Sequence, residues 1–308
     1  MSKFIIRRFF ALIPTMLIIV TVCFFLIRLA PGGPFSSEKK LPPQILANIE
    51  AKYHLDEPLI QQYGRYLFNV IQGDLGPSYK YKDYDVNYYI GISLPISMLL
   101  GGLAMLLALV FGMSAGMLSS LKQNTGWDYA AMALAVFGIS VPVFVIAPLL
   151  MWIFAVNFRI LPVAGWVDEH GLKALVLPVI SLSVAYFATI ARLSRASFLE
   201  TLRSDYIRTA RAKGLKTSVI MFKHVLKGAS LPVVSYLGPA LSGIVTGSIV
   251  VEKIFRVPGL GRHFVQSAFN RDYTMVMGTV IVYSVLLLIM NFVVDIAYGF
   301  LDPRISYK

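Results

Sequence analysis

The chain is poor in charged residues and contains almost no cysteine. Of its 308 residues, 14% are charged, whereas ordinary soluble domains carry about a quarter. This deficit, together with 57% hydrophobic residues, predicts a membrane protein rather than a soluble domain. The one cysteine, Cys23, excludes an intrachain disulfide and any metal site built from several cysteines.

Motifs for catalysis and for metal or nucleotide binding are also missing. No G-x-S-x-G stands in the sequence, and none of the four histidines belongs to an HExxH motif. The segment Gly214-Leu215-Lys216-Thr217 resembles a phosphate-binding loop, but Leu215 separates the glycine from the lysine, so the phosphate cradle is lost. We therefore expect no catalytic residue, no metal site and no cofactor bound by this chain.

A net charge of +12 is the feature that could indicate a nucleic-acid partner. The basic residues, however, alternate with long apolar runs and form no continuous stripe. Basic loops on the cytoplasmic side of a membrane explain the excess more simply. We expect contact with membrane lipid and none with nucleic acid.

Long apolar segments predict an all-α integral membrane protein. A helix needs about 20 residues to cross roughly 30 Å of hydrocarbon. Six segments meet this requirement: 9–29, 97–119, 130–156, 174–192, 230–251 and 277–298. Pro142 and Pro148 should kink the third span rather than end it.

The bias of arginine and lysine sets the expected orientation. Most basic residues of the short loops and of both termini fall on one face, which predicts that both termini are cytoplasmic. The basic head and apolar body of residues 1–29 resemble an export signal, but the run is long and no A-x-A cleavage site follows. The expected organisation is a retained first helix in 1–29, a region outside the cytoplasm in 30–96, and a membrane core in 97–308. Asp295, inside the sixth span, is expected to pair with a basic loop residue.

The region between the first two spans combines helical and aromatic stretches. A helical pattern runs from Leu41 to Val70 with a break at Pro58, and glycines at 73 and 76 predict a turn. An unusually aromatic stretch follows, with Tyr79, Tyr81, Tyr84, Tyr88 and Tyr89. It is either an interfacial aromatic belt or a docking surface for an extracytoplasmic partner.

A basic polar loop separates the fourth and fifth spans, from Arg192 to Lys227. Ser204 or Asp205 can cap a short helix over Tyr206–Lys213, and Gly214 can end it. Such a helix is too short to be stable alone in water, so Tyr206, Ile207 and Ala210 are candidate anchors in a partner's groove. The sequence of residues 218–227 predicts a second helix. Docking into a protein groove and binding to lipid headgroups both remain open at this point.

The loop also resembles a known family. Tyr206-Ile207-Arg208-Thr209-Ala210-Arg211-Ala212-Lys213-Gly214-Leu215, followed by His224-Val225-Leu226 and Leu231-Pro232, is similar to the cytoplasmic EAA loop of ABC-importer permeases, in their dipeptide, oligopeptide and nickel branch. Arg208-Thr209-Ala210 stands where many relatives have Glu-Ala-Ala. Further matches extend along the whole chain, at Ile6-Arg7-Arg8, Pro31-Gly32-Gly33-Pro34, Gly73-Asp74-Leu75-Gly76, Val257-Pro258-Gly259-Leu260-Gly261, Arg271-Asp272-Tyr273 and Asp302-Pro303-Arg304. Residues 41–90 look most like the B-type subunit of oligopeptide permeases.

This resemblance implies a fold, a location and partners. The fold would be the type I ABC-importer permease fold, with six spans in the bacterial inner membrane. The partners would be a second homologous permease, two cytoplasmic ATPase subunits that hold ATP and Mg²⁺, and an extracytoplasmic peptide-binding protein. The loop 193–229 would contact an ATPase through a coupling helix at Tyr206, Ile207, Arg208, Thr209, Ala210, Arg211, Ala212, Lys213, Gly214 and Leu215. Tyr79, Tyr81 and Tyr84 would face the binding protein.

The implied activity is ATP-driven uptake of oligopeptides, with no covalent chemistry on this chain. Dipeptides, nickel, glutathione and murein peptides remain alternative substrates within the resemblance. A secondary transporter would need coupling-ion residues in mid-membrane, and the spans offer almost none. A membrane assembly protein that does not transport is the other alternative class.

Overall fold

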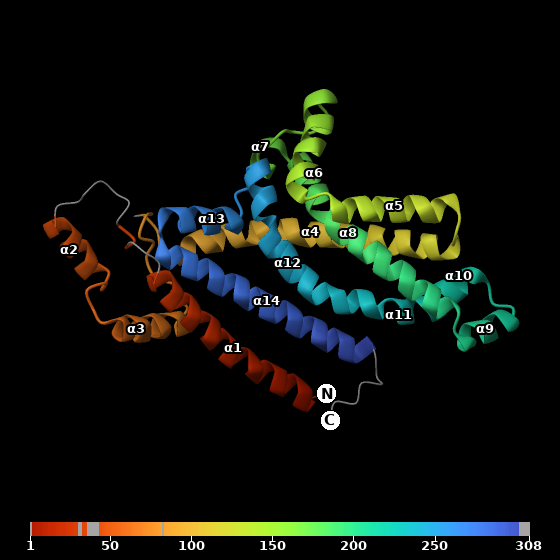
Figure 1. Cartoon of the computed structure of the whole chain (residues 1–308), viewed down its shortest axis with the longest axis horizontal. Coiled ribbons are helices and arrows are strands. Elements are labelled where there is room, and N and C mark those ends of the chain that lie inside the picture. The colour runs from red at the N-terminus through yellow and green to blue at the C-terminus, as the bar shows by residue number, and fades with distance from the viewer. Residues whose placement is uncertain (1, 30–32, 36–42, 82, 302–308) are drawn as a thin grey trace. The chain divides into compact units, whose positions relative to one another are not determined.

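The computed structural model describes residues 2–29, 33–35, 43–81 and 83–301, and in this part every regular element is a helix (Figure 1). The chain divides into two compact units. Unit 1 holds Met1–Arg8, Ser97–Pro258 and Leu286–Lys308, and unit 2 holds Phe9–Ile96 and Gly259–Val285. The all-helical architecture agrees with the class predicted from composition.

The membrane prediction rests on long apolar helices, and the structure contains them. By length and composition, four helices can each cross a membrane: α1 (Ser2–Leu29), α4 (Val86–Leu121), α8 (Lys173–Leu202) and α14 (Tyr273–Leu301). Two bent helix pairs raise the number to six if each pair forms one span. The helix α4 begins well before residue 97, so 86–96 belongs to this long helix.

The third expected span is the first bent pair. It consists of α5 (Gly126–Ser140), then α6 (Val143–Leu150) continued by the π-helical η1 (Met151–Asn157), with an angle of 110° between the two parts. The prediction that Pro142 only kinks this span is wrong. Val141 is extended, with φ −96° and ψ 118°, because the proline ring disfavours the α conformation in the residue before it. Pro148, in contrast, lies inside α6.

The remaining helices are shorter or bent. The second bent pair is α12 (Leu231–Phe255), which changes direction by 45° between its two halves. Arg256 ends α12 in a left-handed conformation, at φ 56°. The others are α2 (Pro43–Lys52), α3 (Leu59–Ile71), α7 (Val167–His170), α9 (Asp205–Ala212), α10 (Thr217–Val219), η2 (Ile220–Val225), α11 (Leu226–Ala229) and α13 (Leu260–Asn270).

Unit 1 is packed around α8, against which α5, α6 and α12 lie. Small residues allow the close approach of α4 and α8. A Cβ atom added at Gly112 would meet the Ile190 Cγ2 at 2.9 Å, and one added at Gly116 would meet the Ala191 carbonyl oxygen at 2.6 Å. These glycines are therefore contact points between α4 and α8.

Unit 2 contains the region that was expected outside the membrane. The two predicted helices are present as α2 and α3, and Gly73 and Gly76 have φ of 81° and 86°, as the predicted turn requires. The buried carboxylate of Asp272 ties the segment after this turn, at residues 78–79, to the start of α14. It accepts hydrogen bonds from the Ser78 hydroxyl and, at 3.1 Å, from the Tyr79 backbone N–H.

Candidate functional site

The basic loop folds as a helix and a second helical run, as the sequence predicts. The helix α9 covers Asp205–Ala212, and Gly214 follows it with φ 74°. Ser204 occupies the N-cap position, but its hydroxyl donates to the Thr201 carbonyl oxygen at 2.6 Å and makes no capping bond to α9. The second run comprises α10, η2 and α11 and leads directly into α12.

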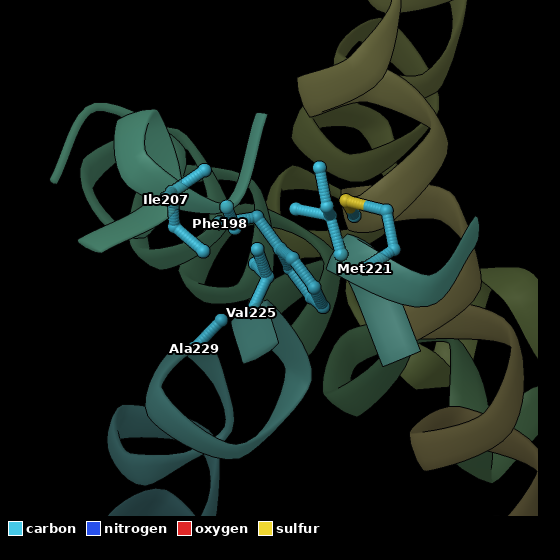
Figure 2. Close-up of a cluster of buried hydrophobic side chains, with 7 residues drawn as sticks. Phe198, Ile207, Met221, Val225 and Ala229 are labelled. Carbon is cyan, nitrogen blue, oxygen red and sulfur yellow. The ribbon is translucent and has the colours of Figure 1, made fainter. Parts of the chain in front are cut away.

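A cluster of buried apolar side chains holds this loop together, and Figure 2 shows it. The end of α8 contributes Phe198, α9 contributes Ile207, and η2 contributes Met221 and Val225. Phe198, Ile207 and Val225 are each 0% exposed. The short helix α9 is thus stabilised by tertiary packing within the chain, because eight residues form no stable helix alone in water.

This packing corrects one sequence-based expectation. Ile207 and Ala210 are buried in the chain's own cluster, so they are not anchors for a partner's groove. Tyr206 is the exception, since 52% of it is exposed. The sequence pattern correctly gave α9 an apolar side but could not say which molecule that side contacts.

The outer side of α9 is polar and basic. The Arg208 side chain is 77% exposed, and its Nη1 lies 3.5 Å from the Asp205 carboxylate. The other residues of the predicted coupling segment that point outward are Thr209, Arg211, Ala212, Lys213, Gly214 and Leu215. The structure therefore presents most of the predicted segment to solvent, with Ile207 and Ala210 beneath it.

An ion pair with a buried carboxylate, which the sequence analysis missed, lies close to the start of this loop. Arg195 of α8 binds the buried carboxylate of Asp128, in the first turn of α5, through two hydrogen bonds of 2.7 Å. The same carboxylate accepts from the Ser119 hydroxyl and, at 2.9 Å, from the Asn124 backbone N–H. The signal in the sequence is an acid and a base at the ends of two apolar segments.

Comparison with known families decides the identity. The profile of the binding-protein-dependent transport system inner membrane component matches residues 108–307, which is more than half of the chain. The chain belongs to this family. A profile of the N-terminal part of such membrane components matches residues 1–82. The chain is accordingly an inner membrane transport component and not an enzyme.

Individual relatives of this transport component match along its whole length. It is 51% identical over 307 residues to the oligopeptide transport system permease protein OppB of Salmonella typhimurium, with 100% of both chains covered. The OppB of Escherichia coli is equally similar, at 51% with the same coverage. The dipeptide transport system permease protein DppB of Bacillus subtilis is 47% identical, over 99% of this chain and 98% of its own.

The transport component also shares its fold with a solved structure. A chain of the inward-facing MetNI methionine ABC transporter aligns with a TM-score of 0.58 and 19% identity, over 70% of this chain and 97% of that chain. The predicted type I importer permease fold is thereby confirmed.

The predicted docking tyrosines of this transport component have different surroundings. Tyr79 packs against Tyr53, with ring centroids 4.9 Å apart, and burial raises its pKa to about 12. Tyr81 packs against Tyr89 at 4.9 Å. Tyr84 is 52% exposed and stacks on Tyr88 at 4.0 Å. Of the three, Tyr84 is therefore the one that offers an exposed ring to a partner.

Two carboxylates lie on the apolar helices α12 and α14. Asp295 pairs with Arg8 at 3.0 Å, so its partner lies on α1 and not in a loop as expected. Glu252, on α12, is 0% exposed and accepts from the hydroxyls of Ser97 and Ser248 at 2.6 and 2.5 Å. The sequence analysis missed Glu252, although an acid at the end of an apolar run is a visible signal. Its bonds connect α12 to α4 within unit 1.

Proposed function

We propose that this chain is the membrane permease subunit of an ATP-driven importer of oligopeptides. The observation that carries the proposal is the 51% identity, over the full length, to the OppB proteins of Salmonella typhimurium and Escherichia coli. The DppB of Bacillus subtilis, at 47% identity, makes dipeptides the second candidate substrate.

The proposed assembly contains a second homologous permease, two cytoplasmic ATPase subunits and an extracytoplasmic peptide-binding protein. ATP and Mg²⁺ are bound by the ATPase subunits. The segment Gly214-Leu215-Lys216-Thr217 supports this division of labour, because it lacks the glycine that a phosphate loop needs next to its lysine. The role of this chain is mechanical gating.

In the proposed mechanism, α9 is the coupling helix and its exposed side lies in a cleft of one ATPase subunit. Closure of the ATPase pair moves α9, and the buried cluster around Phe198 passes that movement to α8. The pair Arg195–Asp128 and the close approach at Gly116 connect the same end of α8 to α5 and α4. Coupling through packed helices of this kind needs two discrete arrangements, here inward-facing and outward-facing.

Gly214→Glu tests the coupling role. Gly214 has φ 74°, and an added Cβ would meet nothing within 4 Å, so the change acts through backbone strain and through the surface it alters. Gly73→Glu is the matched control, because Gly73 has φ 81°, equally open surroundings and the same pattern of backbone hydrogen bonds after a helix, but lies outside the loop. We expect Gly214→Glu to abolish peptide uptake while the protein stays in the membrane, and Gly73→Glu to transport. Normal uptake by Gly214→Glu would contradict the assignment.

The substrate is tested with the complete transporter. Reconstituted with its ATPases, second permease and binding protein, it should hydrolyse ATP faster when oligopeptides are added. The cognate binding protein should prefer these to dipeptides in a direct binding assay. A preference for dipeptides would support the second candidate, and no stimulation by either would contradict peptide import.

Contact with the binding protein is tested at Tyr84. The chain has one cysteine, so a Cys23→Ser background allows a single crosslinking position. We expect Tyr84→Cys to crosslink to the binding protein and Tyr79→Cys, at a packed position, to crosslink poorly. Crosslinks from Tyr84→Cys to lipid alone would support the interfacial aromatic belt instead.

A further inference from the structure

Unit 2 contains a cavity of about 150 Å³ that the proposed transport mechanism does not use. Its wall is formed by the ends of α1 and α2, by α3, by the turn after α3 and by the start of α14. Arg28, Lys52 and Arg65 line it, together with the tyrosines 53, 66, 79 and 273. Three cations and four phenol rings, against one lining acid, Asp74, indicate an anionic ligand.

Arg28 has no carboxylate partner among the described residues. Its Nε donates to the Gln62 side-chain oxygen at 3.1 Å, and its Nη1 approaches the Met277 sulfur at 4.0 Å. The guanidinium carbon lies 3.6 Å from the centre of the Phe24 ring. These neighbours orient the guanidinium without neutralising it, and its remaining N–H groups are available to a ligand.

The two carboxylates near the cavity, Glu57 and Asp74, have hydrogen-bond partners other than Arg28. Glu57 binds the Arg65 Nη2 at 2.7 Å and the His54 Nδ1 at 3.3 Å. Asp74, the one acid in the described lining, accepts the Gly76 backbone N–H at 2.8 Å. Arg65 is thus neutralised by Glu57, whereas Arg28 is not.

Tyr66 adds a hydrogen-bond donor. Its hydroxyl oxygen is buried and has no hydrogen-bond partner in the described part of the chain. Burial raises its pKa, so the phenol stays neutral and keeps its proton at neutral pH. A buried hydroxyl without a partner costs free energy, which an oxygen acceptor in the cavity would recover.

From this arrangement we propose that the cavity binds a phosphate group, held by the Arg28 guanidinium and the Tyr66 hydroxyl. Guanidinium groups bind phosphate with paired, charge-assisted hydrogen bonds. The cavity accepts only a compact group, such as a phospholipid headgroup phosphate or a free phosphate ion.

The position of Arg28 is suited to either source. The membrane-crossing part of α1 covers 25 residues, Ile5–Leu29, and at 1.5 Å per residue it is longer than the roughly 30 Å of hydrocarbon. Arg28 stands in its last turn, which this length would carry to the level of the headgroups. Its neighbours Leu26 and Leu29 are 61% and 77% exposed, as expected of a helix end in contact with lipid.

Two probes test the site on the purified, delipidated full-length chain in a phosphate-free detergent. Native mass spectrometry counts phosphatidylglycerol molecules retained after addition, and ³¹P NMR line broadening reports the binding of inorganic phosphate. Arg28→Gln is compared with Arg7→Gln, which removes the same charge from the exposed opposite end of α1. Tyr66→Phe is the second variant, in case Arg28→Gln does not fold.

We expect Arg28→Gln to weaken binding about tenfold or more, Tyr66→Phe to weaken it severalfold, and Arg7→Gln to leave it unchanged. If Arg28→Gln retains less phosphatidylglycerol than the wild type, the bound phosphate belongs to a lipid headgroup. If Arg28→Gln loses only the NMR line broadening, the bound phosphate is the free ion. Equal binding by the wild type, Arg28→Gln and Tyr66→Phe overturns the proposal, as does the absence of binding to both probes. Peptide uptake is not needed for this test, so its result is independent of the proposed transport function.

Discussion

Arg195 donates from Nε and Nη2 to the two carboxylate oxygens of Asp128, at 2.7 Å each, and so joins α8 to α5 with a forked ion pair. Asp128 is buried, whereas 27% of the Arg195 side chain is exposed. The carboxylate has further donors in Ser119 and Asn124. The pair therefore fixes the α4–α5 connection to the C-terminal part of α8, which forms the beginning of the basic loop.

Removing this arginine should destabilise the chain more than removing an exposed arginine from the same helix. Arg195→Met leaves a buried carboxylate without its cation, and we expect a loss of about 3 kcal/mol in the free energy of unfolding. Arg192→Met is the control, since Arg192 is exposed on the same helix and should change stability by about 0.5 kcal/mol or less. Denaturant unfolding in detergent measures both. Equal stabilities would show that the pair contributes little.

The close contact of α4 with α8 gives a second prediction. In Gly116→Ala the new Cβ would lie 2.6 Å from the Ala191 carbonyl oxygen and 2.8 Å from the Arg195 backbone nitrogen, so the helices must separate. We expect destabilisation of about 1–3 kcal/mol and reduced transport. Gly102→Ala is the matched control on α4, because its Cβ would meet nothing within 4 Å and should be neutral or stabilising. Thermal unfolding of both variants checks the difference, and a stable Gly116→Ala would contradict it.

The elements that could be predicted from the sequence are those governed by local pattern. The length of the apolar runs predicts the long helices. Proline and glycine predict the break before α3 and the turn after it, and Gly214 predicts the end of α9. The 110° bend at Pro142 was not predicted, because a proline in an apolar run is compatible with a kink or a break. Which of the two occurs depends on the helices packed around it.

The contacts between distant segments could not be read from one sequence. Nothing local pairs Asp128 with Arg195 or Glu252 with Ser97, and the apolar side of α9 fits a partner's groove as well as the chain's own cluster. The coupling segment itself was identified by its resemblance to the loop of a known family, and not by a local pattern. Amphipathicity shows that a face is buried, and only the fold shows what buries it.

The cluster under α9 leads to a third prediction. Phe198→Ala removes a ring that is 0% exposed at the centre of this cluster, which should cost about 3–5 kcal/mol. Because the cluster holds α9 in place, trypsin should cleave the basic segment around Arg208 and Arg211 faster than in the wild type. Phe222→Ala is the control, since Phe222 is 64% exposed and lies outside the cluster. Equal cleavage of both variants would contradict the role of the cluster.

A pH dependence is expected from His263 on α13. Its ring lies 5.4 Å from that of Tyr89 and 6.3 Å from that of Tyr81, and its Nδ1 is buried without a hydrogen-bond partner in the described residues. Burial, and then the charge of Arg262, lower the pKa of His263 below its usual value. The unfolded chain therefore binds this proton more readily than the folded chain. Stability should fall as the pH drops below about 6.5 and level off once the folded-state histidine is protonated too.

The slope of stability against pH isolates this contribution. Between pH 7.5 and 5.5, the thermal unfolding temperature of the wild type should fall more steeply than that of His263→Gln, which has no proton to bind there. His170→Gln is the control, because the His170 side chain is 42% exposed, and it should keep the wild-type slope. If His263→Gln also kept that slope, another group would have to carry the pH dependence. A shallower slope in His263→Gln alone would place the proton on this ring, because the two variants lose the same titrating group from different surroundings.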